Sequence, residues 1–263
     1  MADRFTSCLP DCVQLFEMKI IGHRGGTPNL PENTMAAFHE AQRLGADGIE
    51  FDVQQCSDGA LVVIHDLTLD RTTNGSGLIA QTTSNHVASL DAGSWHSERF
   101  AGQRVPRLAE VLELDGLDFE LELKGYGRTF LQSVLACVAE HEAFGRIEFT
   151  SSNVPLLGLL KEQLPEAQVG FFSQPKHPSL TDEAFEHYIV GVASTAPFDV
   201  AHVNAEFVST SIVERLHGLG MAAHANDAMT AEDVQRARDA GADKLSANDV
   251  EMARSVADRT TPR

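Results

Sequence analysis

The sequence predicts an α/β protein built as a (β/α)8 TIM barrel. Short apolar runs with β-branched residues alternate with amphipathic segments along the chain, which is typical of a parallel sheet with helices outside it. About eight such units in 263 residues fit a closed barrel better than an open, doubly wound sheet. The 43% hydrophobic content is ample for the core of such a domain.

The expected strands are 19–22, 48–53, 61–65, 117–123, 146–150, 168–172, 201–204, 221–225 and 243–246. The expected helices are 34–44, 108–114, 129–141, 154–163, 209–219, 230–240 and 250–257. Several helices carry end signals, such as Thr230 as an N-cap and Gly241 as a stop. Residues 1–17 show no clear period, so we expect them to be an N-terminal extension of a single barrel domain spanning 18–263.

The second and third strands interrupt the regular alternation. Only a short turn containing Ser57-Asp58-Gly59 separates them, which is too short for a helical crossover, so the two should form an antiparallel hairpin. We therefore expect the barrel to be irregular at this point. The following segment, 66–105, is rich in Thr, Asn, Gly and Ser and contains the only tryptophan, Trp95. A stretch this long with little periodicity predicts an inserted subdomain or lid near the site.

Composition excludes several kinds of partner. A net charge of -18 argues against nucleic acid and against anionic membrane surfaces, because both would repel this protein at long range. No apolar run is long enough for a membrane-spanning helix, there is no exposed basic amphipathic helix, and the N-terminus does not resemble a secretion signal. Four scattered cysteines do not form a disulfide framework. We expect a cytoplasmic protein, and the sequence carries no signal of oligomeric state.

The stretch from Gly48 to Val53 carries two acids, Glu50 and Asp52. In an extended chain alternate side chains share a face, so both carboxylates point the same way. Two carboxylates that face one cavity repel each other unless a cation joins them. A Glu-x-Asp pair alone is also what the solvated face of a strand shows, so its meaning depends on the neighbouring strands.

Those strands also end in polar side chains. His23 and Arg24 follow the first strand, and His65 ends the third. In strand 117–123 and just beyond it, Glu120, Glu122 and Lys124 share one face. Sites in TIM barrels lie at the C-terminal ends of the strands, and charges pointing into a barrel are costly unless they match one another or a ligand. The alternative is that this strand turns Leu121 and Leu123 inward instead.

The combined set of residues indicates phosphodiester chemistry. Three acids offer the hard oxygen ligands that suit one Mg2+ or Ca2+ ion, and two cations beside such an ion fit a phosphoryl group. Two histidines can then remove a proton from the attacking oxygen and donate one to the leaving oxygen. The predicted site comprises Glu50, Asp52, Glu122, Arg24, Lys124, His23 and His65, with a small phosphodiester as substrate. Of the other histidines, we expect only His224 to have a possible site role, because it ends a strand.

The chain also resembles the glycerophosphodiester phosphodiesterase family. The resemblance rests on motifs in matching order, namely His23-Arg-Gly-Gly26, Pro31-Glu-Asn-Thr34, Gly45-Ala-Asp-Gly-Ile-Glu-Phe-Asp-Val53, the segment from His65 to Gly77, Asp91-Ala-Gly-Ser-Trp95, Val105-Pro-Arg-Leu108, Glu122-Leu-Lys124 and Thr150-Ser-Ser-Asn153. It covers about residues 19–165. The resemblance implies a (β/α)8 barrel with a small insertion after the third strand.

For the site, the resemblance implies His23 and His65 as the acid/base pair, Glu50, Asp52 and Glu122 as ligands of Ca2+ or Mg2+, and Arg24 and Lys124 as phosphate contacts. Glu120 has no acidic counterpart and stays outside the expected site. The implied products are an alcohol and glycerol 3-phosphate, released either through attack by the glycerol 2-hydroxyl or by direct attack of water.

The last third departs from the family pattern. Ala223-His-Ala-Asn226 stands where the family commonly has Trp-Thr-x-Asn, so an aromatic wall of the pocket is missing unless His224 or Phe172 replaces it. Two alternatives therefore stay open. One is a related phosphodiesterase with another leaving group, such as a lysophospholipid or a sugar phosphodiester; the other is a non-catalytic barrel that binds a phosphorylated ligand.

Overall fold

The computed structural model describes residues 18–259. Eight parallel strands close into a barrel, which confirms the predicted fold class: β1 (Lys19–His23), β2 (Gly48–Gln55), β4 (Asp118–Leu123), β5 (Ile147–Ser151), β6 (Gln168–Phe172), β7 (Val200–Asn204), β8 (Ala222–Ala228) and β9 (Lys244–Ala247). Closure occurs at β1, which pairs with β2 on one side and with β9 on the other. The expected extension, residues 1–17, lies outside the described residues.

The ninth strand, β3 (Leu61–Val63), pairs antiparallel with β2 outside the ring, as the short turn predicts. Val53 lies opposite Val63, and the Ile64 amide donates to the Asp52 carbonyl at 2.9 Å. The hairpin therefore carries the chain directly from the acids of β2 to His65.

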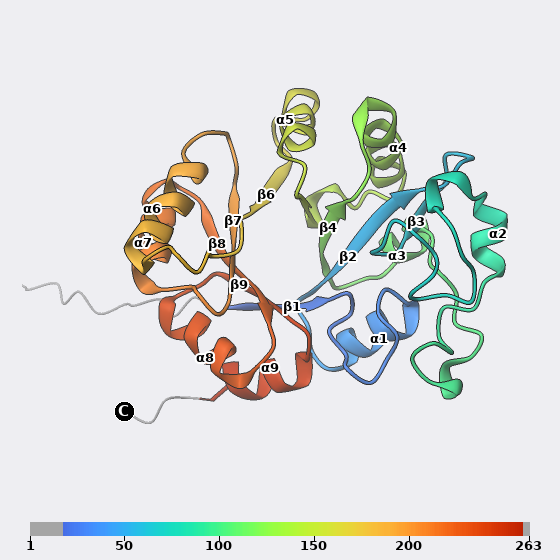
Figure 1. Cartoon of the computed structure of the whole chain (residues 1–263), viewed down its shortest axis with the longest axis horizontal. Helices are drawn as coiled ribbons and strands as arrows, with labels where there is room; N and C mark the ends of the chain where they lie inside the picture. Colours follow the sequence, from blue (N-terminus) through green and yellow to red (C-terminus); the bar gives the residue numbers. More distant parts are fainter. Residues whose placement is uncertain (1–17, 260–263) are drawn as a thin grey trace, which may run out of the picture.

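Helices surround the barrel (Figure 1). They are α1 (Met35–Arg43), α3 (Leu108–Leu112), α4 (Gly127–Glu140), α5 (Val154–Gln163), α6 (Asp182–Ala193), α7 (Thr210–Gly218), α8 (Ala231–Ala240) and α9 (Val250–Ala257). Helix α6 was not predicted, although its start is marked by Thr181, whose side chain accepts a hydrogen bond from the Ala184 amide, and by two acids in its first turn. No helix in residues 18–259 is long and apolar enough to cross a membrane.

The apolar core lies between the strands and the helices. Outward-facing side chains such as Phe51, Phe119 and Phe149 are fully buried there, because alternate strand residues point toward the helices. The inward-facing residues of the same strands are largely polar, including Glu50, Glu120 and Glu148, which are also buried. The barrel interior is thus built from charges and imidazoles where most TIM barrels have branched aliphatic residues.

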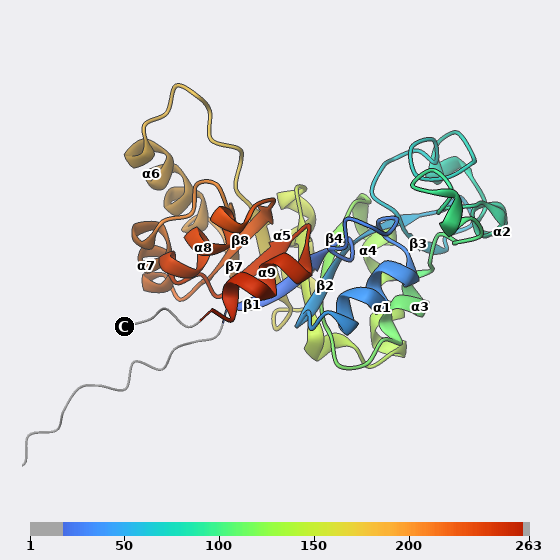
Figure 2. The same cartoon turned by 90° about the horizontal axis from the view of Figure 1, so that it is seen from below.

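Residues 66–105 form an excursion after β3 with helix α2 (Ser84–Ser89) and short 3-10 turns at Ile79–Gln81 and Glu98–Phe100. Together with residues 56–64 it buries a second, smaller apolar cluster of Cys56, Val62, Ile64, Leu69, Ile79, Val87, Leu90, Ala92 and Val105. Figure 2 shows this excursion and the loop between β6 and α6 rising on the same side of the barrel. A third 3-10 turn, Phe144–Arg146, leads into β5.

Candidate functional site

A cavity of about 510 Å³ opens at the C-terminal ends of the strands, where the fold predicts a site. It is lined by His23, Arg24, Glu50, Glu120, Glu122, Lys124, Ser152, Phe172, Ser173, Pro175, Asn204, Glu206, Phe207, Asn226, Asp227 and Ser246. Five of the seven residues predicted from the sequence are in this lining. Asp52 is fully buried next to them, and His65 lies beside Asp52 rather than in the cavity wall.

The three acids face one another across the β2–β4 pair, in which Asp52 lies opposite Glu122. One carboxylate oxygen from each of Glu50, Asp52 and Glu122 lies within 4.8 Å of the other two. Burial, and then the neighbouring charges of Asp52 and Glu122, raise the pKa of Glu50 well above its usual range. Burial likewise raises the pKa of Glu122 to about 7, with Asp52 adding to the effect.

Two cations hold this acidic cluster in place. Lys124 Nζ lies 2.7 Å from Glu122 Oε1 and 3.1 Å from Asp52 Oδ1. The backbone amide of Arg24 donates to Glu50 Oε2 at 2.9 Å. The side-chain Nε of Arg24 lies 3.4 Å from Asp52 Oδ2. Burial alone would raise the pKa of Asp52, but Lys124 and Arg24 hold it below the usual range. Asp52 is therefore ionised while its neighbours resist ionisation.

His23 ends β1 with its two ring nitrogens in different surroundings. Nδ1 lies 2.8 Å from Asn248 Oδ1, which can only accept, so Nδ1 carries the proton. Nε2 lies 3.8 Å from Glu50 Oε2, toward the acidic cluster. Burial, and then the charge of Arg24, lower the pKa of His23, so the ring is neutral with an available lone pair on Nε2.

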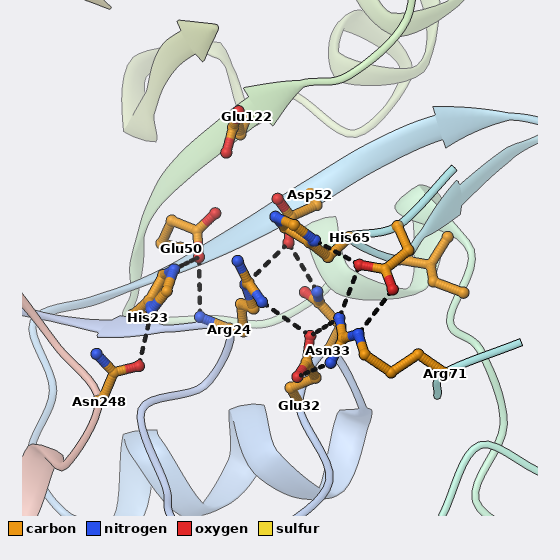
Figure 3. A network of polar contacts seen from close by, with 12 residues as sticks. His23, Arg24, Glu32, Asn33, Glu50, Asp52, His65, Arg71, Glu122 and Asn248 are labelled. Carbon is orange, nitrogen blue, oxygen red and sulfur yellow. Dashed lines mark hydrogen bonds and ion pairs between the residues drawn. The ribbon is translucent and has the colours of Figure 1, made fainter. Parts of the chain in front are cut away.

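His65 has a different setting. Its Nδ1 donates to Asp66 Oδ1 at 2.7 Å, and the Asp66 carboxylate also accepts two hydrogen bonds from Arg71. Arg71 in turn binds Glu32, whose Oε1 accepts from Arg24 at 3.0 Å. Figure 3 shows this chain of contacts, with His23 and His65 on opposite sides of Arg24.

Sequence reasoning missed the residues that orient the predicted ones. They are Glu32, Asn33, Asp66, Arg71 and Asn248. Asn33 donates its side-chain amide to Asp52 Oδ2 at 2.8 Å, with a backbone φ of 54°. Four of them lie in or directly beside the motifs Pro31-Glu-Asn-Thr34 and His65-Asp66-Leu-Thr-Leu-Asp-Arg71, which was the available signal. Asn248 reaches His23 only through barrel closure between β1 and β9, so no local pattern could reveal it.

The donor set fits a hard divalent cation. Three carboxylates crowd a buried site in which two of them have raised pKa values, and an ion with charge +2 would relieve their mutual repulsion. Oxygen donors favour Mg2+ or Ca2+ over Zn2+. The residues that could hold such an ion are Glu50, Asp52 and Glu122.

Of the two residues that could replace the missing aromatic wall, Phe172 lines the cavity and His224 does not. Phe172 lines the cavity, together with Phe207 from the loop after β7. His224 has no solvent-exposed surface and is absent from the lining; it points into the barrel below the cavity. The structure thus supplies aromatic surface near the site from β6 and the loop after β7 rather than from β8.

The TIM barrel brings two histidines, three acids and two cations to its strand ends, a set of groups that suits phosphodiester chemistry. Residues 23–252 match the Glycerophosphoryl diester phosphodiesterase family, and the chain belongs to that family. It is therefore an enzyme of the glycerophosphodiester phosphodiesterase class.

Relatives agree in sequence and in structure. The chain is 41% identical to a glycerophosphodiester phosphodiesterase of Caldanaerobacter subterraneus, over 63% of this chain and 73% of the relative. A Bacillus subtilis enzyme of the same name is 31% identical over 76% of this chain and 73% of its own length. An Oleispira antarctica phosphodiesterase, solved in complex with the product sn-glycerol-3-phosphate, has 27% identity and a TM-score of 0.80, covering 93% of this chain and 98% of that one.

Proposed function

We propose that this enzyme hydrolyses small glycerophosphodiesters, such as glycerophosphocholine or glycerophosphoethanolamine, to an alcohol and glycerol 3-phosphate. The observation that carries the proposal is the acidic cluster of Glu50, Asp52 and Glu122, flanked by Arg24 and Lys124 in a cavity of about 510 Å³. The product named in the Oleispira antarctica structure supports the glycerol 3-phosphate half of the substrate.

Arg24 and Lys124 would bind the phosphate. Both lie in the cavity lining, and each also contacts the acids, so a phosphoryl group between them would meet two cations at fixed positions. A divalent cation held by Glu50, Asp52 and Glu122 would polarise a phosphoryl oxygen and offset the charge that develops there. Glu32 keeps the Arg24 guanidinium oriented for this contact.

The surroundings of the two histidines suggest different roles. His23 is neutral, donates from Nδ1 to Asn248 and keeps a lone pair on Nε2, which suits a base that takes the proton of the attacking hydroxyl. His65 donates from Nδ1 to the Asp66 carboxylate, which can stabilise the imidazolium and so suits an acid that protonates the leaving alcohol. The assignment is the same whether the attacking group is the glycerol 2-hydroxyl or water.

The activity is tested by measuring release of glycerol 3-phosphate from glycerophosphocholine and glycerophosphoethanolamine, with EDTA and after restoring Ca2+ or Mg2+. We expect metal-dependent turnover that is lost in His23→Ala and retained in the control His86→Ala, a change at an exposed histidine in α2. No turnover by a folded, metal-loaded wild-type enzyme would refute the substrate class.

The proposed roles of His23 as base and His65 as acid can be tested separately with substrates that differ in their leaving group. A nitrophenyl ester of glycerol 3-phosphate needs no protonation of its leaving oxygen, so His65→Ala should lose far less activity on this ester than on glycerophosphocholine. His23→Ala should lose activity on both. An equal loss in both variants on both substrates would contradict the assignment.

A further inference from the structure

A second group of potential metal ligands lies inside the barrel, below the catalytic acids. Glu120, His202 and His224 come from β4, β7 and β8, and one donor atom from each lies within 4.8 Å of the other two. Both histidines have no exposed surface, and Glu120 is 3% exposed. The three residues have no part in the phosphodiester chemistry described above.

His202 is held by a hydrogen bond on one side of its ring. Its Nε2 lies 2.6 Å from Glu148 Oε1, and the other oxygen of that carboxylate accepts from Lys244 at 2.6 Å. Glu148 accepts from the Lys244 ammonium through one oxygen, and its other oxygen accepts the proton carried by His202 Nε2. His202 Nδ1 lies 3.4 Å from Glu120 Oε1, yet no hydrogen bond forms between them.

A carboxylate that fixes one nitrogen of a histidine is the usual support of a metal-bound imidazole. The opposite nitrogen can then bind a metal, and here His202 Nδ1 lies 3.4 Å from Glu120 Oε1. Within residues 18–259, His202 Nδ1, His224 Nδ1 and Glu120 Oε2 are buried without any hydrogen-bond partner. Of these atoms, His202 Nδ1 lies opposite the Glu120 carboxylate, and buried polar atoms without partners are unfavourable unless a ligand joins them.

The spacing of the group is compatible with metal coordination in which each imidazole lies near a different Glu120 oxygen. Metal bonds of ~2.1 Å in a tetrahedron put ligand atoms about 3.4 Å apart. His202 Nδ1 lies 3.4 Å from Glu120 Oε1, and His224 Nε2 lies 3.6 Å from Glu120 Oε2. Ser246 Oγ lies 2.8 Å from His224 Nε2, and an ion bound to this nitrogen would replace that hydrogen bond.

The backbone leaves room for this arrangement. At Gly170, the inward-facing position of β6, an added Cβ would come within 2.4 Å of Glu148 Oε1 and 2.6 Å of His202 Nε2. A second cavity of about 220 Å³ reaches the group from the other end of the barrel, and its lining includes Glu120, Glu148, His224 and Lys244. Glu120 also lines the catalytic cavity, so the group borders a cavity at each end.

We propose that Glu120, His202 and His224 form a structural metal site for Zn2+ or Co2+ in the barrel interior, separate from the catalytic carboxylates. Two imidazoles and one carboxylate favour these borderline ions, whereas the all-oxygen catalytic set favours Mg2+ or Ca2+. An ion there ties β4, β7 and β8 together across the barrel.

Titration with Co2+ in the presence of saturating Mg2+ tests the proposal. The wild-type protein should bind one equivalent of Co2+ with the visible absorption of tetrahedral, imidazole-bound cobalt, both on addition to the folded protein and after refolding with the ion. Glu122→Gln, which alters only the catalytic set, should keep this absorption and His224→Gln should lose it. Glu148→Gln should weaken binding about 10- to 100-fold, because the support of His202 is lost.

Absence of the cobalt absorption from folded wild-type protein would overturn the proposal. So would its loss in Glu122→Gln or its persistence in His224→Gln. If His224→Gln does not fold, anomalous diffraction from wild-type crystals soaked in Co2+ decides, since a peak is expected between Glu120, His202 and His224. None of these readouts depends on catalytic turnover.

Discussion

The acid Glu122 should lower the stability of the metal-free enzyme, and replacing it with glutamine should raise it. In the fold its pKa is raised from 4.5 to about 7, chiefly by burial. An acid whose pKa is higher in the folded state than in the unfolded state makes the fold less stable as pH rises between the two values. Glutamine has nearly the same shape but cannot ionise, so Glu122→Gln avoids this effect.

The size of the effect follows from the pKa. A change from 4.5 to about 7 corresponds to about 3 kcal/mol once the pH is above 7. The Lys124 ammonium at 2.7 Å loses a partner in the variant, which reduces the gain, so we expect about 1–3 kcal/mol. For a domain of this size that is an increase in Tm of roughly 2–10 °C.

The assay is thermal unfolding of wild type and Glu122→Gln in EDTA from pH 5 to pH 8. The two Tm values should be close at pH 5 and should separate as pH rises toward 8, with the variant higher. Adding Ca2+ should reverse the order, because the wild type keeps its full ligand set. A variant that is less stable than wild type in EDTA at pH 8, or a difference that does not change with pH, would refute the reasoning.

Three further outcomes are expected. Asp66→Asn should lower kcat on the order of 10²-fold with little change in Tm, because His65 loses the carboxylate at 2.7 Å; equal kcat values for variant and wild type would contradict this role. Gly170→Ala should lower stability by about 1–3 kcal/mol in chemical denaturation, because its Cβ would come within 2.4 Å of Glu148; an unchanged midpoint would show that the interior can relax. Leu69→Ala should cost about 2–5 kcal/mol if the excursion unfolds together with the barrel, and a separate early transition would show that it does not.

The sequence could predict the barrel from its alternation of apolar runs and amphipathic segments, and it could predict the two faces of β4 because that strand alternates strictly. Phe119, Leu121 and Leu123 face the helices, while Glu120 and Glu122 face inward, so the period of two identifies both the strand and its polar side. The catalytic acids stood out for the same reason. The alternative orientation, with the leucines inside, is wrong because those side chains complete the apolar layer under the helices.

Other features depend on contacts that no local pattern contains. Asn248 reaches His23 only because β9 closes against β1. His202 and His224 were expected to be ordinary histidines or, for His224, part of the pocket wall. They meet because β7 and β8 pair in register, with each histidine directly opposite the other. The repeated pattern Ala-His-x-Asn at 201–204 and 223–226 was the available signal, and it becomes informative only when the two strands are known to be neighbours.

The polar lumen also bears on how the protein assembles. In most TIM barrels a half-barrel folding intermediate exposes an apolar inner face as well as unpaired strand edges. Such intermediates are prone to aggregation. Here a half-barrel would present carboxylates and imidazoles on that face, with the apolar side already covered by its own helices. Two fragments of the chain, divided between β4 and β5, should therefore remain unaggregated until they associate. We expect the enzyme to be reconstituted from two separately expressed halves.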